Sequence, residues 1–256
     1  MPIGDPGRPE ALVVIVTGAA RGIGRACALA MARRGFAVAL ADRLAAELEA
    51  TTGEVRGLGV DALALPGDVA DFAAVQAQGR EALERWGRVD VLVNNAGAPQ
   101  PKTLVEISEE EYDRTIAINL KGCFNWCKAV APAMLSRQRG RIVNISSVSA
   151  HNGAGPNAVS RFAYCTAKAG VLGLTRGLAK ELAPHVTVNA ICPGSVRTEL
   201  TAALFDRRER EILAAIPLAR FGTPEDIAEV VAYLATVSPN FITGEVIDVD
   251  GGQWIN

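Results

Sequence analysis

The 256-residue sequence lacks the features that would place it in a membrane or on a nucleic acid. No apolar run approaches the roughly 20 residues that a transmembrane helix needs. The 26 lysines and arginines nearly balance the 28 aspartates and glutamates without forming a basic block, so we expect no membrane and no nucleic acid as partner. Residues 1–10 are polar and contain prolines but no apolar segment, and we expect a flexible N-terminal tail rather than a secretory signal.

Cysteine and histidine are also scarce, with five and two residues respectively. The odd number of scattered cysteines excludes a fully paired disulfide framework and is typical of reduced thiols in a cytoplasmic protein. Cys123 and Cys127 lie four residues apart on one predicted helix, but the histidines lie elsewhere in the sequence. We therefore interpret both cysteines as core residues and predict no metal site.

The stretch from Leu12 to Gly24 is the most informative part of the sequence. Leu12–Val16 is a continuous apolar run, which predicts a strand buried on both faces. Thr17, Gly18, Gly22 and Gly24 follow with the spacing T-G-x-x-x-G-x-G, and a helical pattern starts there. A strand, a glycine turn and a helix together form a unit that cradles phosphates in dinucleotide-binding folds, although glycine-rich turns also arise for purely steric reasons.

Strand and helix patterns alternate along the remaining chain. This alternation predicts a single α/β domain over residues 11–256, with a Rossmann-type doubly wound parallel sheet of seven strands and helices on both faces. We expect a mobile substrate lid at residues 198–215. The further predicted strands cover 37–41, 62–65, 89–93, 141–145, 186–191 and 245–249, and the main later helices 71–86, 108–135, 160–182 and 224–236.

Two aspartates stand at predicted strand ends. Asp42 ends the second strand, where a dinucleotide fold places the carboxylate that binds an adenosine ribose and repels a 2′-phosphate. It also suits a cap for the helix that starts near Ala45, and both roles can coexist. Asp68 follows the third strand, where it either caps the helix starting near Asp71 or meets the adenine ring.

Two candidate positions carry asparagine. Asn95, Ala96 and Gly97 follow the fourth predicted strand, where an amide can hold neighbouring backbone and small residues leave room for a ligand; an ordinary asparagine-glycine turn is the alternative. Asn119 lies among apolar residues in the middle of the predicted 108–135 helix. An amide there is costly unless it is hydrogen-bonded.

Tyr164 and Lys168 lie four residues apart on the predicted 160–182 helix, and hence on one face. An ammonium beside a phenol favours the phenolate, which makes Tyr164 a candidate acid or base near neutral pH. Taken alone, a Tyr-x-x-x-Lys pair also occurs in ordinary surface packing.

Together these motifs resemble the compact single-domain branch of the short-chain dehydrogenase/reductase family, from Ala11 to the C-terminus. Ser147, Pro193, Gly194 and Thr198 extend the match. The resemblance implies that Tyr164 exchanges a proton with the substrate oxygen, that Ser147 hydrogen-bonds this oxygen, that Lys168 holds the nicotinamide ribose, and that Asn119 anchors a water. It implies cofactor contacts for Gly18, Arg21, Gly22, Ile23, Gly24, Asp42, Asp68, Val69, Asn95, Ala96, Gly97, Tyr164, Lys168, Pro193, Gly194, Val196 and Thr198.

The resemblance implies a hydride-transferring oxidoreductase that acts on a secondary alcohol or ketone, and a homotetramer. Asp42 favours NAD over NADP. The substrate stays open between a carrier-linked 3-oxoacyl group, whose reductases generally prefer NADPH, and a polyol, sugar or hydroxy acid. Arg137, Arg139 and Arg141 are candidates for part of a basic patch toward an acidic carrier protein; for two of them, solvated loop charges are the equal alternative. The alternative to an enzyme is a non-catalytic protein that senses nicotinamide nucleotides.

One departure from the family pattern lies between Ser147 and Tyr164, where the connection is longer than usual. The extra residues bring Ser149, His151 and Asn152 near the predicted site. They face either the substrate, or solvent and another subunit.

Overall fold

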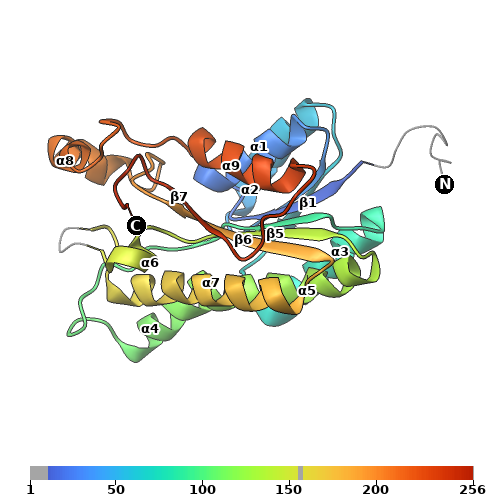
Figure 1. Ribbon diagram of the computed structural model, residues 1–256, viewed down its shortest axis with the longest axis horizontal. Helices are drawn as coiled ribbons and strands as arrows, with labels where there is room; N and C mark the ends of the chain where they lie inside the picture. The colour runs from blue at the N-terminus through green and yellow to red at the C-terminus, as the bar shows by residue number, and fades with distance from the viewer. Residues whose placement is uncertain (1–10, 155–157, 256) are drawn as a thin grey trace.

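A computed structural model describes residues 11–154 and 158–255, so the predicted tail at 1–10 lies outside the described residues. The strands form one parallel sheet of seven, in the order β3-β2-β1-β4-β5-β6-β7 (Figure 1). This confirms the predicted doubly wound fold. The strands are β1 (Val13–Thr17), β2 (Ala37–Asp42), β3 (Ala62–Pro66), β4 (Val91–Asn94), β5 (Gly140–Ile145), β6 (Val186–Pro193) and β7 (Val246–Val249).

Helices cover both faces of the sheet (Figure 1). On one face lie α1 (Gly22–Ala32), α2 (Ala45–Gly57) and α9 (Pro224–Thr236), and on the other α3 (Phe72–Trp86), α5 (Gly122–Ser136) and α7 (Phe162–Glu181). The remaining helices are α4 (Glu109–Ile116), the π-helix η1 (Ala117–Lys121), α6 (Ser149–Asn152) and α8 (Ala202–Ala214). Among the described residues, no helix is both long and apolar enough to cross a membrane.

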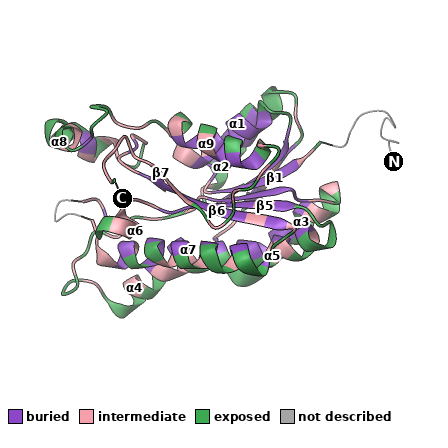
Figure 2. Ribbon diagram, in the orientation of Figure 1, coloured by how far each residue is buried: buried purple, intermediate pink, exposed green. Residues whose placement is uncertain are grey.

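The alternation of side chains along each strand divides the core in two, and Figure 2 shows the buried residues on both sides of the sheet. Val14 and Val16 of β1 pack in the cluster that includes α1 and α9. Val13 and Ile15, on the opposite face, pack with Trp126 of α5 and the residues around it. Because helices cover both faces of the sheet, the central strands are continuous apolar runs in the sequence. This pattern is what allowed them to be predicted.

The predicted helix at 108–135 is not one regular α-helix. α4 and α5 are joined through the π-helix η1, which contains Asn119. The N-terminal end was predicted correctly, because Ser108 and Glu111 form a capping box. The 198–215 stretch contains α8, whose helical geometry is interrupted at Arg208 (φ −132°, ψ 23°).

The strand order reverses between β1 and β4. The chain builds β2 and β3 on one side of β1, crosses back, and then adds β4 to β7 on the other side. Such a reversal opens a crevice beyond the carboxyl ends of the two strands, which is where ligands bind in sheets of this kind.

A buried ion pair holds the opposite, amino end of β1 and β4. The Asp90 carboxylate accepts hydrogen bonds from the backbone N–H of Val13 (2.8 Å) and from Arg88 (2.8 and 2.6 Å). Only 6% of the Asp90 side chain and 11% of the Arg88 side chain is exposed. The carboxylate therefore joins the beginnings of two central strands.

We expect Asp90→Ala to lower the free energy of unfolding by about 3–5 kcal/mol, because it removes one partner of a buried pair. Asp61→Ala is the matched control: Asp61 pairs with Arg85 at 2.5 Å, but 47% of its side chain is exposed, so its loss should cost about 1 kcal/mol or less. Urea denaturation of both variants measures the difference. Equal losses of unfolding free energy in the two variants would show that burial does not increase the contribution of the Asp90 pair to stability.

Candidate active site at the carboxyl edge of the sheet

A cavity of about 640 Å³ lies over the switch point, lined by residues that follow β1, β2, β4, β5 and β6. Most of the predicted site residues meet there, and four do not line it: Gly24, Asp68, Val69 and Asn119. The predicted residues that line the cavity are Gly18, Arg21, Gly22, Ile23, Asp42, Asn95, Ala96, Gly97, Ser147, Tyr164, Lys168, Pro193, Gly194, Val196 and Thr198.

The glycine turn places the start of α1 against this cavity. Gly18 and Gly22 adopt positive φ angles of +65° and +56°, which favour glycine. A Cβ on Gly24 would lie 2.0 Å from the Gly18 carbonyl oxygen, so Gly24 lets the helix approach the turn. Arg21, the N-cap residue, makes no capping hydrogen bond with its side chain. The first N–H groups of α1 thus remain available for an anion.

Thr17 and Asn95 join the carboxyl ends of β1 and β4. The Thr17 hydroxyl oxygen accepts hydrogen bonds from the backbone N–H of Asn95 (2.9 Å) and of Ala96 (3.0 Å). In return, the Asn95 amide donates to the carbonyls of Thr17 (2.9 Å) and Gly18 (3.2 Å). Asn95 therefore fixes the glycine turn, as the prediction for its amide required. The role of Thr17 was not foreseen.

Asp42 is held rigidly at the end of β2. One carboxylate oxygen accepts from the backbone N–H of Ala20 and the other from that of Leu44, each at 3.0 Å. Leu44, not Asp42, is the N-cap residue of α2, and its side chain makes no cap bond. The prediction that Asp42 caps the next helix is therefore wrong in detail, because the chain turns for two residues before α2 begins.

Asp68 does not line the cavity, and its carboxylate is bound to α4. Its carboxylate pairs with Arg114 and accepts a hydrogen bond from the Ala70 N–H at 2.9 Å. Partial burial opposes ionisation, but these two donors hold the pKa of Asp68 below its usual range. Asp71, not Asp68, caps α3 through the Ala74 N–H, so the capping alternative for Asp68 is wrong. Val69 packs against Gly122, and its carbonyl accepts from Asn125 at 2.8 Å.

Asn119 is completely buried in the π-helix, and both its amide nitrogen and its oxygen have hydrogen-bond partners. Its amide donates to the carbonyls of Ala98 and Thr115, each at 3.0 Å, and its oxygen accepts from the Ala98 N–H at 3.1 Å. The buried amide is thus satisfied, as its position demands. A Cβ on Gly97 would lie 2.9 Å from this oxygen and 3.5 Å from Lys168 Nζ, so the glycine keeps open the space between the two atoms.

Tyr164 and Lys168 lie on one face of α7, as predicted. Lys168 is only 3% exposed, and its ammonium lies 5.6 Å from the centroid of the Tyr164 ring. The ammonium donates to the Ile145 carbonyl at 2.8 Å, at the end of β5. Lys168 lines the cavity, and this bond compensates part of the cost of burying a lysine.

The two serines after β5 differ in what they contact. The Ser146 hydroxyl is buried and donates to the Lys168 carbonyl at 2.8 Å, which ties β5 to α7. The Ser147 hydroxyl oxygen accepts from the Ser149 N–H at 3.1 Å. Its proton is not used in that bond, so Ser147 is the serine that can donate to a substrate oxygen.

The segment after β6 forms another wall. Pro193 ends β6, Gly194 packs against Asp250, and the Ser195 N–H donates to the Gln253 amide oxygen at 2.6 Å. The Thr198 N–H donates to the Thr201 hydroxyl at 2.9 Å, just before α8. From α8, further side chains reach the cavity, which the sequence did not single out: Leu204, Phe205, Arg208, Glu211 and Ile212.

The long connection between Ser147 and Tyr164 includes α6, which was not predicted because four residues are too few for a periodic pattern. Ser149 lines the cavity, whereas the His151 imidazole contacts Asp248 at 3.1 Å. Ser160 accepts a hydrogen bond from the Gln100 N–H at 3.3 Å, so the end of the connection also borders the site. Residues 155–157 of this connection lie outside the described residues.

All five cysteines are unpaired and buried. Burial raises the pKa of the Cys27 and Cys127 thiols to about 12, so both are neutral core side chains. This confirms the interpretation of Cys123 and Cys127 as core residues.

The chain is similar to known reductases over nearly its whole length. A family model described as enoyl-(acyl carrier protein) reductase matches residues 18–253. The 3-oxoacyl-[acyl-carrier-protein] reductase of Staphylococcus aureus is 43% identical over 243 residues, 94% of this chain and 97% of that protein. The reductase of the same name from Thermotoga maritima is 40% identical over 248 residues, 96% of this chain and 98% of that protein. A variant of actinorhodin polyketide ketoreductase with NADPH has a TM-score of 0.88 and 36% identity, covering 95% of this chain and 97% of that one.

Proposed function

The chain belongs to the short-chain dehydrogenase/reductase family of oxidoreductases, and we propose that it reduces a 3-oxoacyl thioester with a nicotinamide cofactor. The observation that carries this proposal is the meeting of Ser147, Tyr164 and Lys168 in one cavity with the glycine turn. The substrate class is supported by the two similar 3-oxoacyl-[acyl-carrier-protein] reductases. A polyol, sugar or hydroxy acid is the alternative substrate. The non-catalytic nucleotide sensor is not supported.

The residues around the cavity fit a dinucleotide. The start of α1 would receive the pyrophosphate, Asp42 the adenosine ribose, and Lys168 with Tyr164 the nicotinamide ribose. The further contacts that we propose follow the strand ends: Arg21, Ile23, Asp68, Val69, Asn95, Ala96, Gly97, Pro193, Gly194, Val196 and Thr198. The bound cofactor supplies the hydride, and the protein supplies orientation and the proton.

The chain's own residues manage the proton at the substrate oxygen. We propose that Ser147 donates a hydrogen bond to this oxygen and that the Tyr164 phenol gives it a proton during reduction. The Lys168 ammonium favours the phenolate that this step leaves behind. Gly97 keeps space between Asn119 Oδ1 and Lys168 Nζ, which supports a water at this position that returns a proton from solvent.

We propose that α8 and the residues before it form the lid over the substrate. The interruption of helical geometry at Arg208 divides α8 into two parts, and both parts contribute side chains to the cavity. The predicted basic patch does not flank this opening. Arg141 donates to the carbonyls of Leu234 (2.8 Å) and Val237 (2.7 Å), and Arg137 and Arg139 precede the amino end of β5, opposite the cavity.

We expect Tyr164→Phe to lower kcat for a 3-oxoacyl thioester by about 10²–10⁴-fold while the cofactor still binds, because the change removes the proton donor and leaves Lys168 and the other proposed cofactor contacts in place. Tyr233→Phe, at an exposed position on α9, is the control and should keep full activity. Absorbance of the reduced cofactor gives kcat, and fluorescence titration gives Kd. A near-normal rate in Tyr164→Phe would contradict the mechanism, and turnover of polyols but not of thioesters would contradict the substrate class.

We propose that NAD is preferred over NADP. Both Asp42 oxygens are held by backbone N–H groups, so the carboxylate cannot swing away from a 2′-phosphate. Two like charges a few ångströms apart repel by about one to a few kcal/mol, and each 1.4 kcal/mol is about tenfold in affinity. Arg21 and Arg43 also line the cavity and would offset part of this repulsion, but both are exposed and able to stay in water.

Wild-type kcat/KM should therefore be about tenfold to several hundredfold higher with NAD than with NADP. Asp42→Asn removes the charge at almost the same size and should erode this preference, as should Asp42→Ala. Steady-state kinetics with both cofactors tests the proposal. A wild type that prefers NADP would refute it.

We propose a homotetramer in solution. The outer face of α7 carries small residues, and no atoms come near the Cβ positions of Gly173 and Gly177, so another helix can approach closely. Phe124 of α5 stacks on Phe72 of α3 with its side chain 45% exposed, which leaves aromatic surface for a partner. Light scattering at micromolar concentration should give four times the 26.9 kDa chain mass. A monomeric mass would contradict this.

A further inference from the structure

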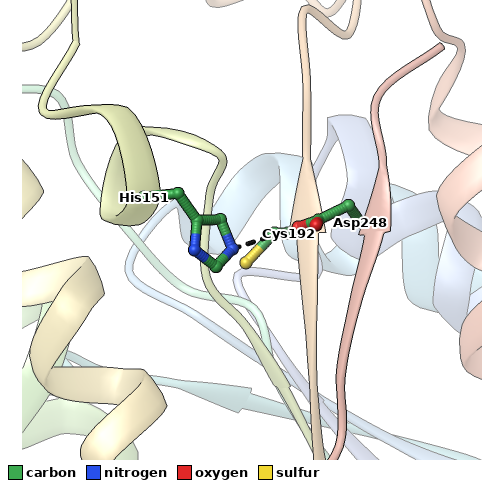
Figure 3. A group of neighbouring side chains, drawn as sticks. All are labelled: His151, Cys192 and Asp248. Atoms are coloured by element: carbon green, nitrogen blue, oxygen red, sulfur yellow. Dashed lines mark hydrogen bonds and ion pairs between the residues drawn. The ribbon is translucent and has the colours of Figure 1, made fainter. Parts of the chain in front are cut away.

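Three potential metal ligands from separate elements meet beside the long connection after Ser147 (Figure 3). They are His151 of α6, Cys192 of β6 and Asp248 of β7. Their ligand atoms all lie within 4.8 Å of one another. Figure 3 shows the imidazole directed toward the thiol and the carboxylate.

The backbone fixes two of the three side chains. Cys192 and Asp248 are direct partners in the parallel pairing of β6 with β7, so their side chains leave the same face of the sheet. Cys192 is completely buried, whereas 16% of the Asp248 side chain remains exposed. The thiol therefore lies at the inner end of the cluster and the carboxylate toward solvent.

The third side chain, His151, is held by contacts with Asp248 and with Trp254. Its Nε2 lies 3.1 Å from Asp248 Oδ1. Its ring stacks on Trp254, with 5.9 Å between ring centroids and 4° between the planes. This stacking holds the imidazole in the plane that directs Nε2 into the cluster. His151 belongs to α6, which begins two residues after Ser147.

We propose that His151, Cys192 and Asp248 form a zinc site. An imidazole nitrogen, a thiolate and a carboxylate oxygen are all ligands that Zn²⁺ accepts, and three protein ligands leave the fourth tetrahedral position for water. A thiolate and a carboxylate together balance the charge of the ion. Zinc binding breaks the S–H bond of Cys192, forms a Zn–S bond, and releases the proton to solvent through the exposed side of the cluster.

The surroundings of Cys192 explain why the metal is needed to form the thiolate. Burial raises the pKa of the Cys192 thiol to about 11, so the thiol is neutral without a cation. The neighbouring Asp248 carboxylate acts in the same direction as burial, whereas the Ser147 N–H lowers the pKa as a hydrogen-bond donor to the sulfur. The Ser147 N–H suits a metal-bound sulfur, which keeps negative charge.

The proposed ion would tie α6 to β6 and β7 immediately next to Ser147. It does not depend on the proposed reduction, since none of the three ligands is assigned a part in hydride or proton transfer. The sequence pattern did not reveal the site because its three residues lie far apart along the chain.

The test uses the full chain, reduced and freed of metal with a chelator, and then titrated with Co²⁺ as a spectroscopic probe. We expect one equivalent per chain and a near-ultraviolet thiolate-to-cobalt charge-transfer band, which Zn²⁺ then removes by displacement. Cys192→Ser should abolish the band. His151→Gln and Asp248→Asn should weaken Zn²⁺ affinity, measured against a chromophoric chelator, by more than the roughly 10–100-fold loss typical of an outer partner.

Cys165→Ser and His185→Gln are matched controls, since each changes a residue of the same type outside the cluster, and both should keep the band and the affinity. Circular dichroism verifies that each variant folds. If Cys192→Ser does not fold, the partly exposed His151 and Asp248 positions still decide the question. Absence of the charge-transfer band in the wild type, or an affinity for Zn²⁺ unchanged by both His151→Gln and Asp248→Asn, would overturn the proposal.

Discussion

The hydrogen bonds between Thr17 and Asn95 are the interaction on which the cavity depends. β1 and β4 are neighbours in the sheet, but two other strands and three helices separate them along the chain. The Thr17 hydroxyl and the Asn95 amide lock their carboxyl ends together with four hydrogen bonds. Because one of these reaches the Gly18 carbonyl, the glycine turn and the loop that holds Gly97 are positioned by the same contact. Gly97 in turn defines the space between Asn119 and Lys168.

A second set of buried polar contacts positions α7 against the sheet. Asn94 of β4 and Asn144 of β5 are partners in the strand pairing, and their side chains bond at 2.9 Å. Asn144 also donates to Thr175 of α7 at 2.9 Å. A buried polar network is favourable only in the arrangement that satisfies its donors, so it specifies one register for strands and helix. The position of Lys168 on α7 follows from this register and from the bond between Ser146 and the Lys168 carbonyl.

Local patterns were sufficient to predict the strands, the order of layers and much of the cavity, because covered parallel strands and amphipathic helices leave a signal in a few consecutive residues. The Tyr164–Lys168 spacing and the turn from Gly18 to Gly24 are local in the same sense. Contacts between distant segments left no such signal. The pairing of Asp68 with Arg114 joins β3 to α4, and the approach of His151 to Asp248 joins α6 to β7. In both pairs, the sequence around one residue does not indicate which distant residue it contacts.

The π-helix at Ala117–Lys121 also sets the phase between the two helices that it joins. A π-turn carries one residue more than an α-turn, and one residue rotates the following helix by about 100°. On one side of it, Tyr112 of α4 stacks on Phe162 of α7 with 6.2 Å between centroids. On the other side, Trp126 of α5 is completely buried under the sheet. The extra residue therefore sets the angle between the face that α4 presents to α7 and the face that α5 presents to the sheet.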